Sequence, residues 1–77
     1  MKVIIYTTPY CAYCKMAKEY FKSKNIEYTE YDVMPDVAKR DEMVKKSGQL
    51  GVPVIDIDGN LVIGFDKPKI NEYLGIK

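Results

Sequence analysis

The chain has 77 residues, a length that favours one domain spanning residues 1–77. Hydrophobic residues make up 47% of it and charged residues 30%, a balance that argues against intrinsic disorder. Twelve basic and eleven acidic side chains leave a net charge of +1, which argues against nucleic acid as a partner because phosphate binding needs a concentrated positive field. Histidine and tryptophan are both absent. Without histidine, catalysis by a Ser-His or Cys-His pair and zinc binding through imidazole are excluded.

The N-terminal segment predicts a strand and no targeting sequence. Residues 3–6 form an apolar run that is typical of a strand buried on both faces, and Pro9 follows it. This run is shorter than the roughly 7–15 apolar residues of a secretory signal or the about 20 of a membrane helix. We therefore expect a cytoplasmic protein with no membrane partner.

The next segment has the periodicity of an amphipathic helix that ends near residues 24–25. Apolar side chains recur at helical spacing along one face, and lysines lie opposite them. The buried stripe is expected to contain Tyr13, Met16, Ala17, Tyr20 and Phe21.

A second strand and a second helix are predicted next. Residues 26–33 alternate imperfectly between apolar and polar side chains, which favours a strand near the edge of a sheet. Asp36 can cap a helix that runs to about Lys46 and is ended by Gly48. Its thin apolar face, formed by Val37, Met43 and Val44, predicts a half-exposed helix.

The last third of the chain predicts a hairpin and a short helix. Two β-branched segments flank Asp58-Gly59, a pair that favours a tight turn because such a turn needs positive φ. Asp66 is expected to cap a final helix with Pro68 in its first turn. The buried face of that helix is expected to contain Ile70, Tyr73 and Leu74. The predicted order is therefore β-α-β-α-β-β-α, an α/β protein.

The two cysteines, Cys11 and Cys14, lie where the first strand gives way to the first helix. If the helix begins at or just after Cys11, unpaired backbone N–H groups and the positive end of the helix dipole favour its thiolate. Spacing of i, i+3 on a helix brings two sulfurs close enough to bond. We expect Cys11 to be the exposed nucleophile and Cys14 the shielded resolving thiol of a disulfide exchange.

Metal binding is the alternative use of the same pair. A structural zinc site usually has four Cys or His ligands, and an iron–sulfur cluster needs a comparable set, so a site here would need two chains. A dimeric metal or cluster carrier is therefore the competing hypothesis. For the oxidoreductase we expect a monomer with no metal and no bound cofactor.

Three segments together resemble glutaredoxins over nearly the whole chain. Residues 6–14, Tyr-Thr-Thr-Pro-Tyr-Cys-Ala-Tyr-Cys, are similar to the glutaredoxin active-site segment, with Ala12 in place of a proline. Gly51-Val52-Pro53 is similar to the family's Thr-Val-Pro, and Gly64-Phe65-Asp66 to its last helix cap. The chain looks most like small bacterial glutaredoxin-like proteins, close to the NrdH-type redoxins.

The resemblance implies a minimal thioredoxin fold: a four-stranded mixed sheet flanked by three helices, two on one face and one on the other. Both hairpin strands are expected to run antiparallel to the first two strands. It also implies a cis peptide at Val52-Pro53, which leaves the Val52 backbone free to pair with an extended substrate.

The expected substrate-binding set consists of Tyr10, Tyr13, Val52, Pro53, Gly64, Phe65 and Asp66. Two of these residues keep a second interpretation. Tyr13 fits a wall beside the cysteines or the core of its helix, and Asp66 fits a contact with the glutathione amine or only a helix cap.

Departures from the glutaredoxin pattern concern the electron donor. The family usually has Lys or Arg where Thr8 stands, Thr where Gly51 stands, and commonly Cys where Phe65 stands. Gly64-Phe65 is similar to the NrdH-type redoxins, which take electrons from a flavin-containing thioredoxin reductase. We therefore expect a protein disulfide as substrate, and a flavoprotein of the thioredoxin-reductase type or glutathione as reductant.

Overall fold

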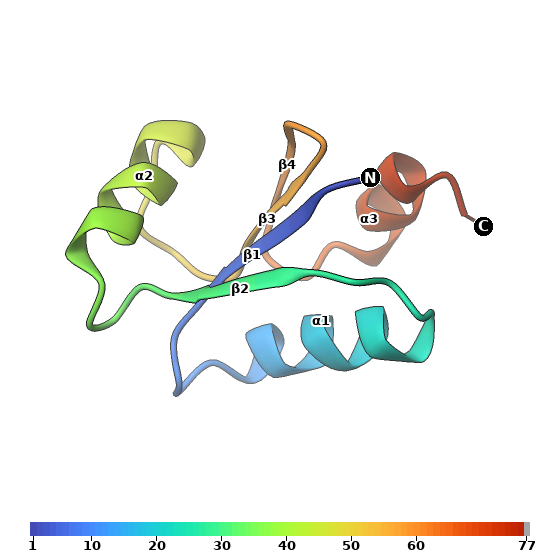
Figure 1. Cartoon of the computed structure of the whole chain (residues 1–77), viewed down its shortest axis with the longest axis horizontal. Helices are drawn as coiled ribbons and strands as arrows, with labels where there is room; N and C mark the ends of the chain where they lie inside the picture. The colour runs from blue at the N-terminus through green and yellow to red at the C-terminus, as the bar shows by residue number, and fades with distance from the viewer. Residues whose placement is uncertain (77) are drawn as a thin grey trace.

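A computed structural model describes residues 1–76 and contains a four-stranded sheet flanked by three helices (Figure 1). The elements are β1 (Val3–Thr7), α1 (Ala12–Ser23), β2 (Thr29–Asp32), α2 (Val37–Ser47), β3 (Val54–Ile57), β4 (Asn60–Ile63) and α3 (Lys67–Leu74). This order confirms the predicted β-α-β-α-β-β-α sequence of elements. No helix among residues 1–76 is long and apolar enough to cross a membrane.

The sheet has the strand order β2-β1-β3-β4. β1 pairs in parallel with β2 and antiparallel with β3, and β4 pairs antiparallel with β3. The prediction that both hairpin strands oppose β1 was wrong for β4, because a hairpin reverses the chain and returns β4 to the direction of β1. Pairing of Tyr6 with Val54 places the end of β1 beside the start of β3, the point at which the cysteine segment and the Val52-Pro53 segment meet.

Each face of the sheet has its own apolar core. α1 and α3 cover one face and α2 covers the other, as predicted, because their buried residues belong to separate cores. The first core contains Val3, Ile5, Ala17, Phe21, Ile55, Ile57, Val62, Ile70 and Leu74. The second contains Ile4, Tyr6, Val33, Met43 and Val54. Alternate residues of β1 therefore point into opposite cores, as the period of a strand requires.

The buried stripe of α1 is rotated from the predicted one. Cys14, Ala17 and Phe21 are its buried residues, whereas Tyr13 is 62% exposed and Met16 is 46% exposed. Residues 14, 17 and 21 are related by i, i+3, i+7 and face the sheet, so their neighbours are turned toward solvent. The prediction of a half-exposed α2 with a thin apolar face is confirmed: Met43 is its one buried residue, and Val37, its first residue, is exposed.

β2 is shorter than the predicted strand over residues 26–33. Asn25 has a φ of 56° and turns the chain at the end of α1. The backbone N–H of Ile26 then bonds to the Phe21 carbonyl at 2.9 Å, so it satisfies the helix end and not the sheet. Strand pairing begins only at Thr29.

Turns and caps follow the predicted residue types. Asp58 and Gly59 have φ values of 51° and 90° in the β3–β4 turn. Asp36 accepts the Lys39 N–H at 3.0 Å at the start of α2, and Gly48 ends that helix with a left-handed φ of 73°.

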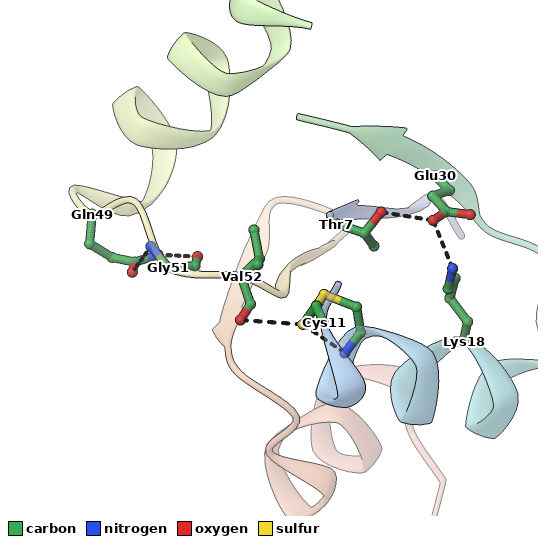
Figure 2. Close-up of a disulfide and its surroundings, with 8 residues drawn as sticks. Thr7, Cys11, Lys18, Glu30, Gln49, Gly51 and Val52 are labelled. Carbon is green, nitrogen blue, oxygen red and sulfur yellow. Dashed lines mark hydrogen bonds and ion pairs between the residues drawn. A yellow bond between two sulfur atoms is a disulfide. The ribbon is translucent and has the colours of Figure 1, made fainter. Parts of the chain in front are cut away.

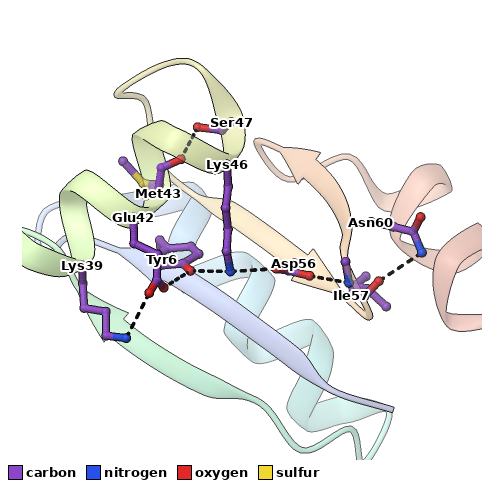
Figure 3. Close-up of polar contacts among 10 residues, drawn as sticks. Tyr6, Lys39, Glu42, Met43, Lys46, Ser47, Asp56, Ile57 and Asn60 are labelled. Atoms are coloured by element: carbon purple, nitrogen blue, oxygen red, sulfur yellow. Dashed lines mark hydrogen bonds and ion pairs between the residues drawn. The ribbon is translucent and has the colours of Figure 1, made fainter.

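A polar network lies between α2 and the sheet (Figure 3). The buried Tyr6 hydroxyl donates to the Glu42 carboxylate and accepts from Lys46 Nζ at 2.9 Å, and Lys46 also bonds to Asp56 at 2.9 Å. Burial disfavours the charge on Lys46, but its bonds to Tyr6 and Asp56 outweigh that cost and raise its pKa. Burial, together with the bond to Glu42, raises the pKa of Tyr6. The network therefore joins α2 to β1 and β3.

Candidate active site

Cys11 forms the N-cap of α1, directly after the loop that leaves β1. Its backbone is extended, with a φ of −116°, and its Sγ accepts the backbone N–H of Cys14 at 3.1 Å. The first turn of α1 contains no acidic residue, so nothing in that turn offsets the positive end of the helix dipole. The prediction that the helix begins just after Cys11 is confirmed, and this sulfur lies where negative charge is stabilised.

Cys11 and Cys14 are joined by a disulfide, with their Cα atoms 5.2 Å apart (Figure 2). Cys14 is 1% exposed on the buried face of α1, whereas Cys11 is partly exposed. One sulfur of the pair is therefore open to an approaching group and the other is shielded.

The segment before β3 faces this pair. The Val52-Pro53 peptide is cis, as the resemblance implied, and the Val52 carbonyl oxygen lies 3.8 Å from Cys11 Sγ (Figure 2). Pro53 is buried, and its carbonyl accepts the Gly64 N–H at 2.8 Å. Three residues of the expected substrate-binding set, Val52, Pro53 and Gly64, are thus connected beside Cys11.

The two tyrosines of the expected set are on the surface. Tyr10 is 87% exposed and Tyr13 is 62% exposed. The interpretation of Tyr13 as a residue of the helix core was therefore wrong. The structure leaves it as an exposed aromatic side chain between the two cysteines in sequence.

Phe65 and Asp66 both have partners within the chain. The Phe65 ring packs edge-on against Tyr20 of α1, with ring centroids 5.9 Å apart. Asp66 caps α3 by accepting the Lys69 N–H at 3.2 Å. The capping role that the sequence allowed for Asp66 is present in the structure.

A cavity of about 600 Å³ opens on the other side of Cys11, between α1 and β2. At one wall, Glu30 accepts hydrogen bonds from the buried Thr7 hydroxyl at 2.7 Å and from Lys18 Nζ at 2.9 Å. Burial opposes ionisation of Glu30, but the bonds from Lys18 and Thr7 outweigh it and lower its pKa. Sequence reasoning missed this cluster because it joins β1, β2 and α1, and no local pattern brings these three residues together.

Gln49 was also missed. Its side chain bonds to both backbone groups of Gly51, next to Val52. A lone glutamine in a loop carries no periodic or capping signal, so only the fold reveals this contact.

A metal site is not apparent in the described part of the chain. Residues 1–76 contain no group of three or more His, Cys, Asp or Glu side chains placed to hold an ion. The cysteine pair therefore has no third ligand within the same described chain.

Comparison with known proteins identifies the family. The family model described as Glutaredoxin matches residues 3–62. An uncharacterized glutaredoxin-like 8.6 kDa protein in the rubredoxin operon of Clostridium pasteurianum is 50% identical over 70 residues, which cover 91% of this chain and 93% of that protein. Glutaredoxin 3 of Escherichia coli K12 is 42% identical over 64 residues, covering 83% of this chain and 77% of that protein.

The fold has a close counterpart among solved structures. The crystal structure of the thioredoxin-like protein BC3987 superposes with a TM-score of 0.88 at 35% identity, covering 94% of this chain and 99% of that one. The predicted thioredoxin-like fold is therefore confirmed. Together with the helix-capping Cys11 and its disulfide partner, these matches show that the chain belongs to the glutaredoxin family and is a thiol–disulfide oxidoreductase with a Cys-x-x-Cys active site.

Proposed function

We propose that the protein reduces disulfides in other proteins, with Cys11 as nucleophile and Cys14 as resolving thiol. The observation that carries this proposal is the asymmetry of the pair: Cys11 Sγ caps α1 and accepts a backbone N–H, whereas Cys14 is buried one turn further on. Stabilised negative charge on an accessible sulfur is the property that an attacking thiolate needs.

The reaction proceeds in two exchanges. The Cys11 thiolate attacks one sulfur of the substrate disulfide, forms a mixed disulfide, and displaces the other sulfur as a thiolate that takes a proton from solvent. The Cys14 thiol then loses its proton and attacks Cys11 Sγ, which releases the second substrate thiolate. The product on the protein is the Cys11–Cys14 disulfide, the state that the structure contains. Two electrons from a reductant restore the dithiol.

The substrate is proposed to lie along Val52. Its backbone is adjacent to Cys11 Sγ, and an extended peptide can pair with a free N–H and C=O as a short added strand does. Pro53 and Gly64 support this segment, and the exposed rings of Tyr10 and Tyr13 are proposed to flank the bound peptide.

Electrons are proposed to come from a flavoprotein disulfide reductase of the thioredoxin-reductase type, with glutathione as the other donor to be tested. Three features support the flavoprotein. Thr8 supplies no cation where glutathione-dependent relatives usually have one, Phe65 is packed against Tyr20, and Asp66 is engaged as a helix cap. Turnover of this kind suits a monomer in the cytoplasm, where thiol reductants keep such pairs reduced.

Single cysteine variants test the mechanism. Pre-reduced Cys14→Ser protein, mixed with a disulfide-containing protein, is expected to accumulate a mixed disulfide visible by mass spectrometry without reductant. Cys11→Ser is expected to give neither the adduct nor reduction. Full reduction by Cys11→Ser would refute the assigned roles.

The donor is tested by two coupled assays on the wild-type protein. One couples NADPH oxidation through glutathione and glutathione reductase, and the other through a thioredoxin-reductase-type flavoprotein. We expect faster turnover in the second assay. Faster turnover with glutathione would reverse the assignment of the donor and leave the roles of the cysteines untouched.

A further inference from the structure

The Gln49 side chain makes two hydrogen bonds to the backbone of Gly51, in the loop that joins α2 to β3 (Figure 2). The Gly51 N–H donates to Gln49 Oε1 at 2.6 Å, and Gln49 Nε2 donates to the Gly51 carbonyl at 3.0 Å. A carboxamide that pairs with both the N–H and the C=O of one residue does what a neighbouring strand does for that residue. The loop thus has its pairing partner within its own sequence.

The last turn of α2 holds this segment in place. Ser47 Oγ bonds to the Met43 carbonyl at 2.7 Å and accepts the Gln49 N–H at 3.4 Å. Met43 is completely buried against the sheet. Gln49 is therefore anchored, through its own backbone, to the last turn of α2 beside a completely buried residue.

The two sides of the loop have different partners. Figure 2 shows Gln49 on one side and the Val52 carbonyl directed to Cys11 on the other. While Gln49 holds the backbone groups of Gly51, the carbonyl of the next residue, Val52, lies 3.8 Å from Cys11 Sγ.

We propose that Gln49 is a positioning residue, whose carboxamide holds Gly51 so that the Val52 backbone stays oriented to pair with the main chain of a peptide disulfide at Cys11. This inference rests on the proposed function. The loop then recognises the peptide amide groups next to the substrate disulfide, and not only the disulfide.

The pairing with Gln49 also depends on the absence of a side chain at Gly51. A Cβ atom added to Gly51 would lie 2.6 Å from Gln49 Oε1 and 3.7 Å from Gln49 Cδ, so a side chain at residue 51 and the paired carboxamide exclude one another. The atom in the way belongs to a flexible side chain, so a larger residue at 51 would displace Gln49 and not unfold the loop. The paired conformation of the Gln49 carboxamide therefore requires glycine at residue 51.

The first test compares two disulfides in single-turnover reactions of pre-reduced protein, which need no electron donor. One is the disulfide-linked dimer of acetyl-Ala-Cys-Ala-amide, which has main-chain amides, and the other is 2-hydroxyethyl disulfide, which has none. For Gln49→Ala and for Gln49→Met, which keeps the length of the side chain, we expect the half-saturating concentration of the peptide disulfide to rise about fivefold to tenfold, the effect of one or two weakened hydrogen bonds. The maximal rate, the rate with 2-hydroxyethyl disulfide and the rate of Cys11 alkylation are expected to be unchanged.

Glu27→Ala is the matched control, because Glu27 is exposed and precedes β2 at the end of the sheet opposite to the cysteines. It is expected to match the wild-type protein with both disulfides. An unchanged half-saturating concentration in Gln49→Met, or an equal loss with both disulfides, would overturn the inference. If the wild-type protein reduces neither of the two disulfides, the proposed function is refuted, and the inference with it.

The second test measures the coupling between residues 49 and 51. Gly51→Thr alone is expected to weaken use of the peptide disulfide as much as Gln49→Ala does, because it displaces the carboxamide. Added to Gln49→Ala, it is expected to cause less than a twofold further change. Independent effects that multiply in the double variant would contradict the proposed pairing.

Discussion

The sulfur of Cys11 and the carbonyl oxygen of Val52 lie 3.8 Å apart, although 41 positions separate the two residues. The antiparallel pairing of Tyr6 with Val54 produces this approach, because it places the end of β1 beside the start of β3. A sulfur in a disulfide has no proton to donate, so the approach is a contact in the oxidised state and can become a hydrogen bond only when Cys11 is a thiol. We make four predictions, each for a side chain that holds the strands and helices of this fold together.

The Thr7 hydroxyl contributes to stability through Glu30. Thr7 is 1% exposed at the end of β1, and its bond to the Glu30 carboxylate links β1 to β2. Thr7→Val keeps the shape of the side chain and removes the donor, so we expect the free energy of unfolding to fall by about 1 kcal/mol. Thr29→Val, an exposed threonine on β2, is expected to change it by less than about 0.5 kcal/mol. Urea unfolding of both variants measures the difference, and equal losses would contradict the prediction.

The hydroxyl of Tyr6 is expected to stabilise the packing of α2 on the sheet. It lies between Glu42 and Lys46, so Tyr6→Phe leaves two charged groups without a common partner (Figure 3). We expect a loss of about 1–2 kcal/mol in the free energy of unfolding. Tyr31→Phe is the control, because the Tyr31 ring packs beside that of Tyr6 with centroids 5.8 Å apart and keeps this packing as phenylalanine. A loss in Tyr31→Phe as large as in Tyr6→Phe would contradict a specific role of the Tyr6 hydroxyl and its bonds to Glu42 and Lys46.

Local signals in the sequence were sufficient for most of the fold. Asp36, Gly48, Asp58-Gly59 and Asp66 each satisfy a requirement of the backbone within a few residues, and the structure has them in the predicted caps and turns. Tyr13 and Met16 were misplaced because helical spacing alone does not say which of two adjacent apolar rows faces the sheet. The rotation of α1 is decided by its packing, which buries Cys14, Ala17 and Phe21.

The candidate site was predictable only where its residues are close in sequence or form a known segment. Cys11 and Cys14 share one helix turn, and Val52-Pro53 was recognised by resemblance. The Thr7–Glu30–Lys18 cluster depends on three elements that meet only in the folded chain. The Gln49–Gly51 pair is local, but its role depends on which side of the loop faces Cys11, and that side is decided by the pairing of β3 with β1.

Stability is expected to depend on pH through Glu42. The hydrogen bond from Tyr6 lowers the pKa of this carboxyl below its usual value of 4.5, against the opposing effect of burial and with further help from Lys39. The folded protein therefore binds this proton less readily than the unfolded chain does. The stabilisation is complete above the unfolded value and is lost as the pH falls through the lower folded value.

Glu42→Gln tests this dependence because it keeps an acceptor for Tyr6 and cannot ionise. Since the Glu42 side chain is 37% exposed, solvent screens its interactions, and we expect a difference of only about 0.5 kcal/mol. Between about pH 6 and pH 3, the free energy of unfolding of the variant should fall less steeply than that of the wild-type protein. Parallel curves would exclude Glu42 as a source, and Glu30→Gln, measured in the same way, isolates the other carboxyl with a lowered pKa.

The last prediction separates the two roles considered for Asp66. The side chain caps α3 by accepting the Lys69 N–H, a function that asparagine performs equally well, whereas a contact with the amine of glutathione requires the negative charge. Asp66→Ala is expected to lower the free energy of unfolding by about 1 kcal/mol, and Asp66→Asn to leave it within about 0.3 kcal/mol. Asp36, which caps α2 by accepting the Lys39 N–H at 3.0 Å, provides the matched pair Asp36→Ala and Asp36→Asn. If Asp66 is only a cap, the two asparagine variants should turn over alike in a glutathione-coupled assay. A selective loss in Asp66→Asn, at unchanged stability, would show that the charge binds glutathione and would restore glutathione as an electron donor.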